Sequence, residues 1–276
     1  MVERHTPDPV SFKRMDTTET RNFFLIDTLF QPDKIEMVYW HTDRAIVGGV
    51  VPLKKTLKLE ASKEMASDYF TQRREIGVIN AGDAGVIIVD KKKYTMAFRD
   101  ALYIGRGSKD ITFSSNDPKK PAYFYFLSFP AHKEYPTTHA KISGAEPLKL
   151  GSLEDSNKRT IYKYIHPAGI KSCQLVMGLT ELDPGSVWNT MTAHTHARRC
   201  EIYMYFALSD DARVFHFMGE PNETRHLVMK NREVVLSPSW SIHAGSGTKN
   251  YMFVWAMGGE NQDFGDMDAV KMDVLK

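Results

Sequence analysis

Four side chains in the second half of the sequence have the types and spacing of a metal site: His194, His196, Glu201 and His243. The first two histidines are separated by one residue. Because side chains alternate between the two faces of a β-strand, both imidazoles point the same way and can reach one ion. Three imidazoles and one carboxylate suit zinc, iron, nickel or manganese better than ions that prefer thiolates. The pattern predicts a metal centre.

The spacing between the second histidine and the glutamate predicts a turn. Glu201 follows His196 at an odd offset, which places two side chains on opposite faces of a straight strand. The chain must therefore turn or bulge at residues 197–199, so that Glu201 returns from the next strand. His243 lies too far along the chain to share this loop, so the fold has to deliver it.

A lone histidine is more often a structural residue than a ligand. The four-residue pattern differs because it lies in strand context. The flanking segments 187–191 and 202–206 are rich in β-branched and aromatic residues, which favour strands. His216 and His226 lack such a pattern, and we expect them to be structural.

Composition limits the classes of partner. The 276 residues are 42% hydrophobic and 11% aromatic, enough for a full core without disulfides. Lys and Arg number 36 against 34 Asp and Glu, which gives no basic field for nucleic acid or a membrane surface. We therefore expect a small-molecule partner, no nucleic acid and no membrane. Two cysteines and the absence of a signal-peptide pattern favour a cytoplasmic protein.

Short β-rich segments separated by Gly, Asp and Pro turn signals run along most of the chain. Examples are residues 36–40, 45–51, 75–80 and 86–89. This rhythm favours an all-β sandwich or barrel. Helical periodicity is visible only at residues 61–70 and in the C-terminal tail.

The sequence predicts three parts. Residues 1–22 are polar and read as an N-terminal arm. Residues 130–157 are rich in Pro, Gly, Ser and Thr, so they read as a linker. We therefore predict two domains: a barrel without metal ligands at residues 23–140 and a metal-binding barrel at residues 141–276.

A faint internal repeat supports two barrels. Residues 73–76, Arg-Arg-Glu-Ile, resemble residues 198–202, Arg-Arg-Cys-Glu-Ile, and each segment opens a strand after a polar corner. Such a repeat is expected if one barrel was duplicated and the metal ligands were kept only in the second copy.

The ligand pattern resembles the cupin superfamily, whose small antiparallel barrels bind a metal through His-x-His, a later Glu and a distant His. Nearly the whole chain resembles, within that superfamily, the family of 4-deoxy-L-threo-5-hexosulose-uronate ketol-isomerases, or 5-keto-4-deoxyuronate isomerases, of pectin and uronate breakdown. The segments that carry this resemblance are residues 44–49, 73–80, 99–103, 177–182, 188–191, 237–243, 245–251 and 259–262. Thr192 departs from the Pro expected there and lies outside the ligand set.

The resemblance implies a bicupin fold of two antiparallel jelly-roll barrels, a homohexamer, and one zinc ion per subunit on His194, His196, Glu201 and His243. It implies an aldose–ketose isomerase, an intramolecular oxidoreductase, that converts 5-dehydro-4-deoxy-D-glucuronate to 3-deoxy-D-glycero-2,5-hexodiulosonate. The expected partner is that small uronate.

The residues that handle the proton and the substrate carboxylate are less defined by the sequence. Tyr203 shares the strand face of Glu201 and is a candidate base, while Arg198 and Lys249 are cations near the ligand segments that could hold a carboxylate. Each residue also fits a structural role without function: Tyr203 could belong to the barrel core, and the two cations could lie in solvated loops. Two other classes share the ligand motif: an iron-dependent cupin dioxygenase and a non-catalytic sugar-binding bicupin.

Overall fold

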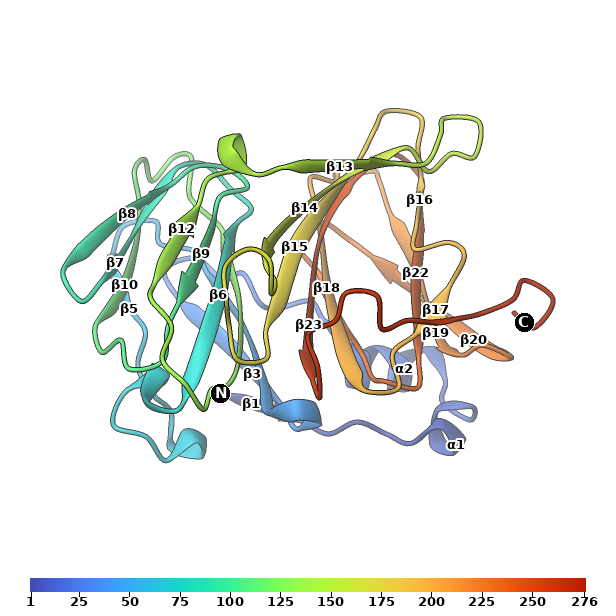
Figure 1. The fold of residues 1–276 in the computed structure, drawn as a ribbon, viewed down its shortest axis with the longest axis horizontal. Helices are drawn as coiled ribbons and strands as arrows, with labels where there is room; N and C mark the ends of the chain where they lie inside the picture. The colour runs from blue at the N-terminus through green and yellow to red at the C-terminus, as the bar shows by residue number, and fades with distance from the viewer. The chain divides into compact units, whose positions relative to one another are not determined.

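The computed structural model describes residues 1–276, and internal contacts divide the chain into two units. Unit 1 comprises Met1–Arg4, Thr28–Ala145 and Tyr164–Val176. Unit 2 comprises His5–Asp27, Glu146–Lys163 and Met177–Lys276. Strands dominate both units and helices are few and short, as Figure 1 shows, so the expected all-β class is confirmed. None of the helices is both long and apolar enough to cross a membrane.

Unit 1 is built around a larger and a smaller sheet. The larger has, in spatial order, β1 (Val2–Arg4), β3 (Ile35–Trp40), β4 (Ala45–Val50), β11 (Phe124–Pro130), β6 (Arg74–Asn80), β9 (Ala101–Ile104) and β12 (Thr138–Ala140). The smaller has β5 (Leu57–Lys58), β10 (Ile111–Ser115), β7 (Gly85–Val89) and β8 (Lys92–Met96). Apolar residues of both sheets form one buried cluster, as expected when two sheets pack face to face.

Unit 2 repeats this plan around the predicted metal ligands. Its larger sheet has, in order, β13 (Pro147–Leu150), β14 (Arg159–Ile165), β15 (Val176–Leu182), β23 (Met252–Gly259), β18 (Arg199–Phe206), β21 (Val234–Ser237) and β2 (Leu25–Ile26). The smaller has β16 (Trp188–Asn189), β22 (Ile242–Gly247), β19 (Val214–Glu220) and β20 (Glu223–Met229). A separate pair joins β17 (His194–Thr195) to β24 (Asp268–Ala269).

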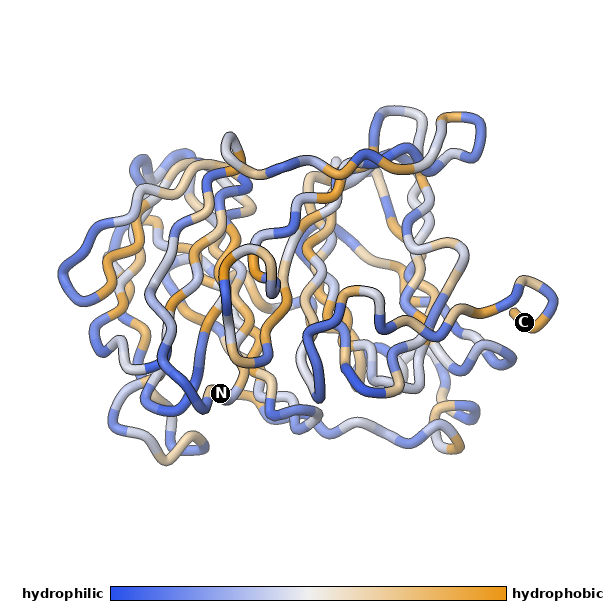
Figure 2. Tube along the Cα trace, viewed as in Figure 1, coloured by the Kyte–Doolittle hydropathy of each residue, from blue (hydrophilic) through white to orange (hydrophobic).

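The two units have the same sheet sizes and the same order of strands except at one edge of the larger sheets. There unit 1 ends in β12, which follows its other strands in the sequence, and unit 2 ends in β2, which precedes them. Strand β6 holds the place in unit 1 that β18 holds in unit 2, and these are the strands that the two Arg-Arg corners open. This correspondence is the architecture expected of two barrels from one duplication. Figure 2 shows apolar strands joined by hydrophilic turns, such as residues 90–91 between β7 and β8.

The N-terminal residues differ from the predicted arm because they are built into unit 2. They form α1 (Pro9–Phe12) and α2 (Thr17–Phe24), and α2 begins at a capping box in which Asp16 and Glu19 exchange hydrogen bonds. Phe12 and Phe24 are buried, and their ring centroids lie 5.3 and 6.2 Å from that of Trp240. This apolar contact, together with the pairing of β2 to β21, explains why the segment packs in spite of its polar composition.

Two other expectations need correction. The predicted linker at residues 130–157 contains strands β12 and β13. All four residues of β13 are exposed, and the alternation of Leu148, Lys149 and Leu150 is too short to distinguish this edge strand from a loop. The helical pattern at residues 61–70 yields only short 3-10 turns such as Lys63–Met65, and the C-terminal tail forms no helix. Segments this short form stable helices only when an apolar face packs on the core.

Candidate metal centre

The four predicted ligands come together in unit 2 from three elements. His194 lies in β17, and His196 follows directly after it. The chain then turns at residues 197 and 198 before β18 begins, so the predicted corner is present and Glu201 returns from the next strand. His243 comes from β22 of the smaller sheet, whereas Glu201 belongs to the larger one. The cluster therefore joins the two sheets.

The donor atoms of this cluster fit one metal ion. The Nε2 atom of His194 lies 3.2 Å from that of His196 and 3.0 Å from that of His243. A carboxylate oxygen of Glu201 lies 2.9 Å from the His196 Nε2 and 3.0 Å from the His243 Nε2. Donors at ~2.0–2.2 Å from one tetrahedral zinc ion stand about 3.3 Å apart, which is close to these separations.

The charges of the cluster also suit a cation. Burial alone would raise the pKa of Glu201, but the neighbouring imidazoles of His243 and His196 hold that pKa well below its usual value, so the carboxylate is ionised. Burial, reinforced by His243, lowers the pKa of His194 to about 3, so this imidazole is neutral and offers a lone pair. One carboxylate and three imidazoles are a donor set that divalent zinc takes. Against the effect of burial, the Glu201 carboxylate raises the pKa of His196 in the metal-free protein, so zinc binding there would displace a proton.

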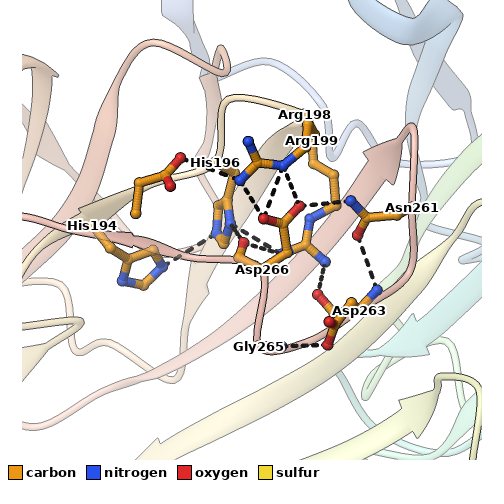
Figure 3. A network of polar contacts seen from close by, with 9 residues as sticks. His194, His196, Arg198, Arg199, Asn261, Asp263, Gly265 and Asp266 are labelled. Atoms are coloured by element: carbon orange, nitrogen blue, oxygen red, sulfur yellow. Dashed lines mark hydrogen bonds and ion pairs between the residues drawn. The ribbon is translucent and has the colours of Figure 1, made fainter.

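Contacts outside the cluster, to Asp266 and Arg199, hold the ring of His196 in place. Its Nδ1 lies 2.7 Å from the backbone carbonyl oxygen of Asp266, which only accepts, and 3.0 Å from the Nη2 of Arg199, which only donates. The shorter contact, to the carbonyl, favours the proton on Nδ1. The Nε2 lone pair then points into the cluster. The Arg199 guanidinium donates to the same carbonyl at 2.8 Å, as Figure 3 shows. Such outer partners typically set the tautomer and the metal affinity.

The segment after β23 is tied to the ligand corner by several contacts visible in Figure 3. The Nε of Arg198 donates to both carboxylate oxygens of Asp266, at 2.8 and 2.9 Å, and Arg199 also donates to the carbonyl of Asp263. The amide of Asn261 donates to the Asp266 carboxylate at 2.6 Å. These bonds hold the Asp266 carbonyl against His196.

A cavity of about 300 Å³ opens beside the cluster, within unit 2. Its wall includes three of the ligands, namely His194, His196 and Glu201. Alternate residues of β23 form an apolar side of the wall: Phe253, Trp255 and Met257. A volume of this size is at the lower end of the range for small-molecule sites.

Tyr203 is the predicted catalytic residue that the structure places at this cavity. Its side chain lines the wall, and its hydroxyl lies 3.0 Å from the Thr190 Oγ1. Burial, with the charge of Glu201 as a smaller cause, raises the pKa of Tyr203 well above its usual value. The phenol is therefore protonated at neutral pH in the metal-free protein.

The structure does not bring the two predicted cations to the cavity. Arg198 is paired with Asp266, and neither it nor Lys249 lines the wall. Lys249 is exposed and its Nζ lies 2.8 Å from a carboxylate oxygen of Asp211. Each of the two cations already forms an ion pair with a carboxylate of the chain. The placement favours Arg198 as a support of the ligand corner.

Sequence reasoning missed two residues of this region. Arg159 in β14 lines the cavity, and the Asp266 carbonyl orients a ligand. Neither has a local motif, although the alternation of Arg159 and Ile161 along β14 is a signal of one face. His216 is buried in the core, where its Nδ1 lies 2.8 Å from the Tyr205 hydroxyl, so its surroundings fit the predicted structural role.

Three histidines and a glutamate held between the two sheets of a β-sandwich define a cupin-type protein with a candidate metal site. Solved structures of low identity share the fold. An IolB-like protein from Salmonella typhimurium is similar with a TM-score of 0.73 at 10% identity, over 90% of this chain and 96% of that one. The oxalate decarboxylase of Lactobacillus farciminis is similar with a TM-score of 0.57 at 11% identity, over 86% of this chain and 83% of that one.

The chain belongs to the KduI/IolB family, whose model matches residues 24–272. Curated relatives are similar along the full length. The protein of Halalkalibacterium halodurans named 4-deoxy-L-threo-5-hexosulose-uronate ketol-isomerase is 54% identical over 276 residues, which is 100% of both chains. Proteins of the same name from Caldicellulosiruptor bescii and Bacillus subtilis are 53% and 51% identical, each over 100% of both chains.

Proposed function

We propose that this chain is a zinc-dependent isomerase that converts 5-dehydro-4-deoxy-D-glucuronate, the substrate in the relatives' name, to 3-deoxy-D-glycero-2,5-hexodiulosonate. One observation carries the proposal: a four-ligand cluster opens on a cavity in a chain that is 54% identical, end to end, to a relative named for this reaction. The reaction belongs to the breakdown of pectin and uronates.

The substrate's name defines the chemistry. It is a six-carbon chain with an aldehyde at C1, a hydroxyl at C2, no hydroxyl at C4, a ketone at C5 and a carboxylate at C6. A ketol-isomerase exchanges the C1 carbonyl with the C2 hydroxyl. In the route we propose, a proton leaves C2 and another is added to C1, while the hydroxyl proton passes from the C2 oxygen to the C1 oxygen through an enediol. No external oxidant is needed, because C2 is oxidised as C1 is reduced.

The donor set of His194, His196, Glu201 and His243 would hold zinc. Bound there, zinc would supply Lewis-acid stabilisation of negative charge on the reacting oxygens without redox side reactions. The chain's own groups supply the rest of the site. The apolar wall of β23 excludes water, and the Tyr203 hydroxyl at the cavity wall is the group that we propose carries a proton for the substrate.

The deciding test follows the reaction in D₂O by NMR with zinc-loaded protein, and uses His243→Ala as the control. Conversion by the wild type but not by the variant supports an isomerase that depends on this cluster, and deuterium in the product identifies the enediol route. Conversion without deuterium would keep the isomerase and point to a shielded proton or a hydride shift. If folded, metal-replete protein gives no conversion, the proposal is wrong. Oxygen uptake by iron-loaded protein would then identify the dioxygenase class, and sugar binding without turnover would identify the binding class.

Assembly and location complete the proposal. We propose a homohexamer in the cytoplasm, on the resemblance described above and on a composition with two cysteines and near-neutral charge. Light scattering at several protein concentrations tests the assembly, since a hexamer of this chain has six times its mass of 31.5 kDa.

A further inference from the structure

We infer that Arg159 is the residue that binds the substrate's C6 carboxylate and so selects acidic sugars over neutral ones. This inference rests on the proposed function, because it names the end of the uronate that reaches Arg159. It is carried by the position of Arg159 in the cavity, by its free charge, and by the chemistry of the substrate.

The first observation is the wall of the cavity. Among the Lys and Arg side chains of the whole chain, Arg159 alone lines this cavity, which it shares with the metal ligands. Its neighbour on the same strand face, Ile161, also lines the wall, as the alternation of side chains along β14 requires. Arg159 therefore faces the cavity from the strand itself, which gives it a defined place.

The second observation is that no carboxylate of the protein neutralises this guanidinium. Its Nη1 donates to the backbone carbonyl of Asn157 at 2.8 Å, and no ion pair involves Arg159. Arg159 is half-buried, and desolvation by that burial lowers its pKa, with Tyr203 and Tyr251 as the neighbours that oppose the shift. A half-buried cation without a counter-ion is costly unless a ligand supplies the charge. The remaining donors of the guanidinium fork suit a carboxylate, which can accept two of them.

The third step concerns length. In the sheet order β14, β15, β23, β18, three strand intervals separate the strand of Arg159 from that of Glu201 and Tyr203. At about 4.8 Å per interval the two backbones stand roughly 14 Å apart. A six-carbon chain with bonds of about 1.5 Å spans roughly 6 Å, and the side chains that reach in from both strands cover the rest.

The polarity of the substrate then fixes its direction. The atoms that react are C1 and C2, and the carboxylate is at the opposite end of the same chain. With C1 and C2 at the metal ligands, C6 extends toward β14. Arg159 thus recognises a part of the substrate that does not react, and its contribution is to binding and orientation.

The test compares the uronate with its neutral C6 amide, using zinc-loaded wild type, Arg159→Gln and Arg159→Lys. A charge-assisted hydrogen bond lost from such a site lowers affinity about 10- to 100-fold. We expect Arg159→Gln to raise KM for the uronate by that factor with a smaller change in kcat, and to leave the amide nearly unaffected. Arg159→Lys should restore part of the loss.

Calorimetric binding of the uronate and the amide provides a readout apart from turnover. Lys158→Gln is the matched control, because it removes one positive charge next to Arg159 from an exposed side chain that pairs with Asp183. It should leave KM unchanged, and thermal melting checks that each variant is folded. Equal losses for acid and amide in Arg159→Gln, or no loss for either, overturn the inference.

The two proposals fail in different ways. If the wild type converts the uronate but Arg159→Gln shows no selective loss for the acid, the function stands and the carboxylate site is wrong. If the wild type binds the acid through Arg159 without converting it, the carboxylate site stands and the isomerase is wrong.

Discussion

Replacing Tyr203 with Phe separates a role in catalysis from a role in the core. The change removes one hydroxyl and keeps the ring, whose centroid lies 4.9 Å from that of Phe253 and 5.5 Å from that of His243. Packing is therefore preserved. The hydroxyl itself lies 3.0 Å from the Oγ1 of Thr190, and it also hydrogen-bonds to the Glu201 carboxylate.

The expected loss of stability is small. The hydrogen bond to Thr190 is neutral and contributes about 0.5–1.5 kcal/mol, and Glu201 keeps the imidazoles of His196 and His243 as partners when the hydroxyl is removed. Thr190 keeps a second partner, since the Asn189 amide donates to its Oγ1 at 3.0 Å, so no buried group is left unsatisfied. For a chain of this size, a loss of about 1 kcal/mol lowers Tm by roughly 2–4 °C. If Tyr203 transfers a proton to or from the substrate, kcat falls by about 10²- to 10⁴-fold.

The assay measures kcat with saturating uronate, Tm by calorimetry, and zinc content by mass spectrometry. Tyr205→Phe is the matched control: it removes one hydroxyl from the same face of β18, from a tyrosine whose partner is His216 and which does not line the cavity. We expect Tyr205→Phe to lower Tm at least as much as Tyr203→Phe, because it leaves the buried His216 Nδ1 without this partner, and we expect a large fall in kcat for Tyr203→Phe alone. If zinc-replete Tyr203→Phe keeps kcat within threefold of wild type, Tyr203 is a core residue and the proton carrier must be sought elsewhere.

Three further outcomes follow from the site. Zinc at 1,000 times its Kd should stabilise the protein by about 4 kcal/mol, so a chelator should lower Tm; an unchanged Tm contradicts metal binding. Asp266→Ala should weaken zinc binding about 10- to 100-fold in competition with a chromophoric chelator. The change removes the carboxylate that Arg198 holds, so the Asp266 backbone carbonyl that contacts His196 is less well fixed. Wild-type affinity would show that this carbonyl stays in place without the carboxylate. Burial lowers the pKa of His216 to about 3, below its value of 6.5 in the unfolded chain. Above pH 6.5 the imidazole is neutral in both states and stability does not depend on it. As pH falls from 6.5 toward 3, only the unfolded state gains the proton, so the folded state loses about 1.4 kcal/mol of stability per pH unit. In chelator-treated protein, His216→Gln should therefore make Tm fall less steeply between pH 6.5 and 4.5, and parallel curves would refute this cause.

The ligand corner was predictable because its signal is local. Strand parity alone required a turn between His196 and Glu201, and the chain turns there, at residues 197 and 198. The delivery of His243 could be stated only as a requirement on the fold. The resemblance to a known family supplied the bicupin architecture that meets this requirement, and the repeated strand order of the two units agrees with it.

Arg159 shows why the rest could not be predicted. It precedes the ligand segment by a whole hairpin and reaches the site because β14, β15, β23 and β18 lie side by side in that order. Sheet order is a long-range property, and no motif marks it in the sequence. Lys158, beside it, is an equally plausible cation by sequence, yet it pairs with Asp183 at 3.2 Å. Proximity to the ligands along the chain favoured Arg198 and Lys249, and this criterion selected residues already neutralised by their neighbours.

The Arg-Arg corner that occurs in both units also shows that a local sequence does not determine the role of a residue. Glu75 opens β6 after an Arg-Arg pair, as Glu201 does in β18, and both carboxylates are buried. The oxygens of Glu75 accept a hydrogen bond from the Tyr103 hydroxyl at 2.9 Å and others from the backbone amides of Cys173, Gln174 and Leu175. In Glu201, one carboxylate oxygen, Oε2, lies within 3.0 Å of two imidazole nitrogens. The same corner sequence therefore supplies a buried carboxylate in both units. The groups that distant segments bring to it determine its role: backbone N–H groups make Glu75 an anchor for the loop at residues 173–175, whereas imidazoles make Glu201 a candidate metal ligand.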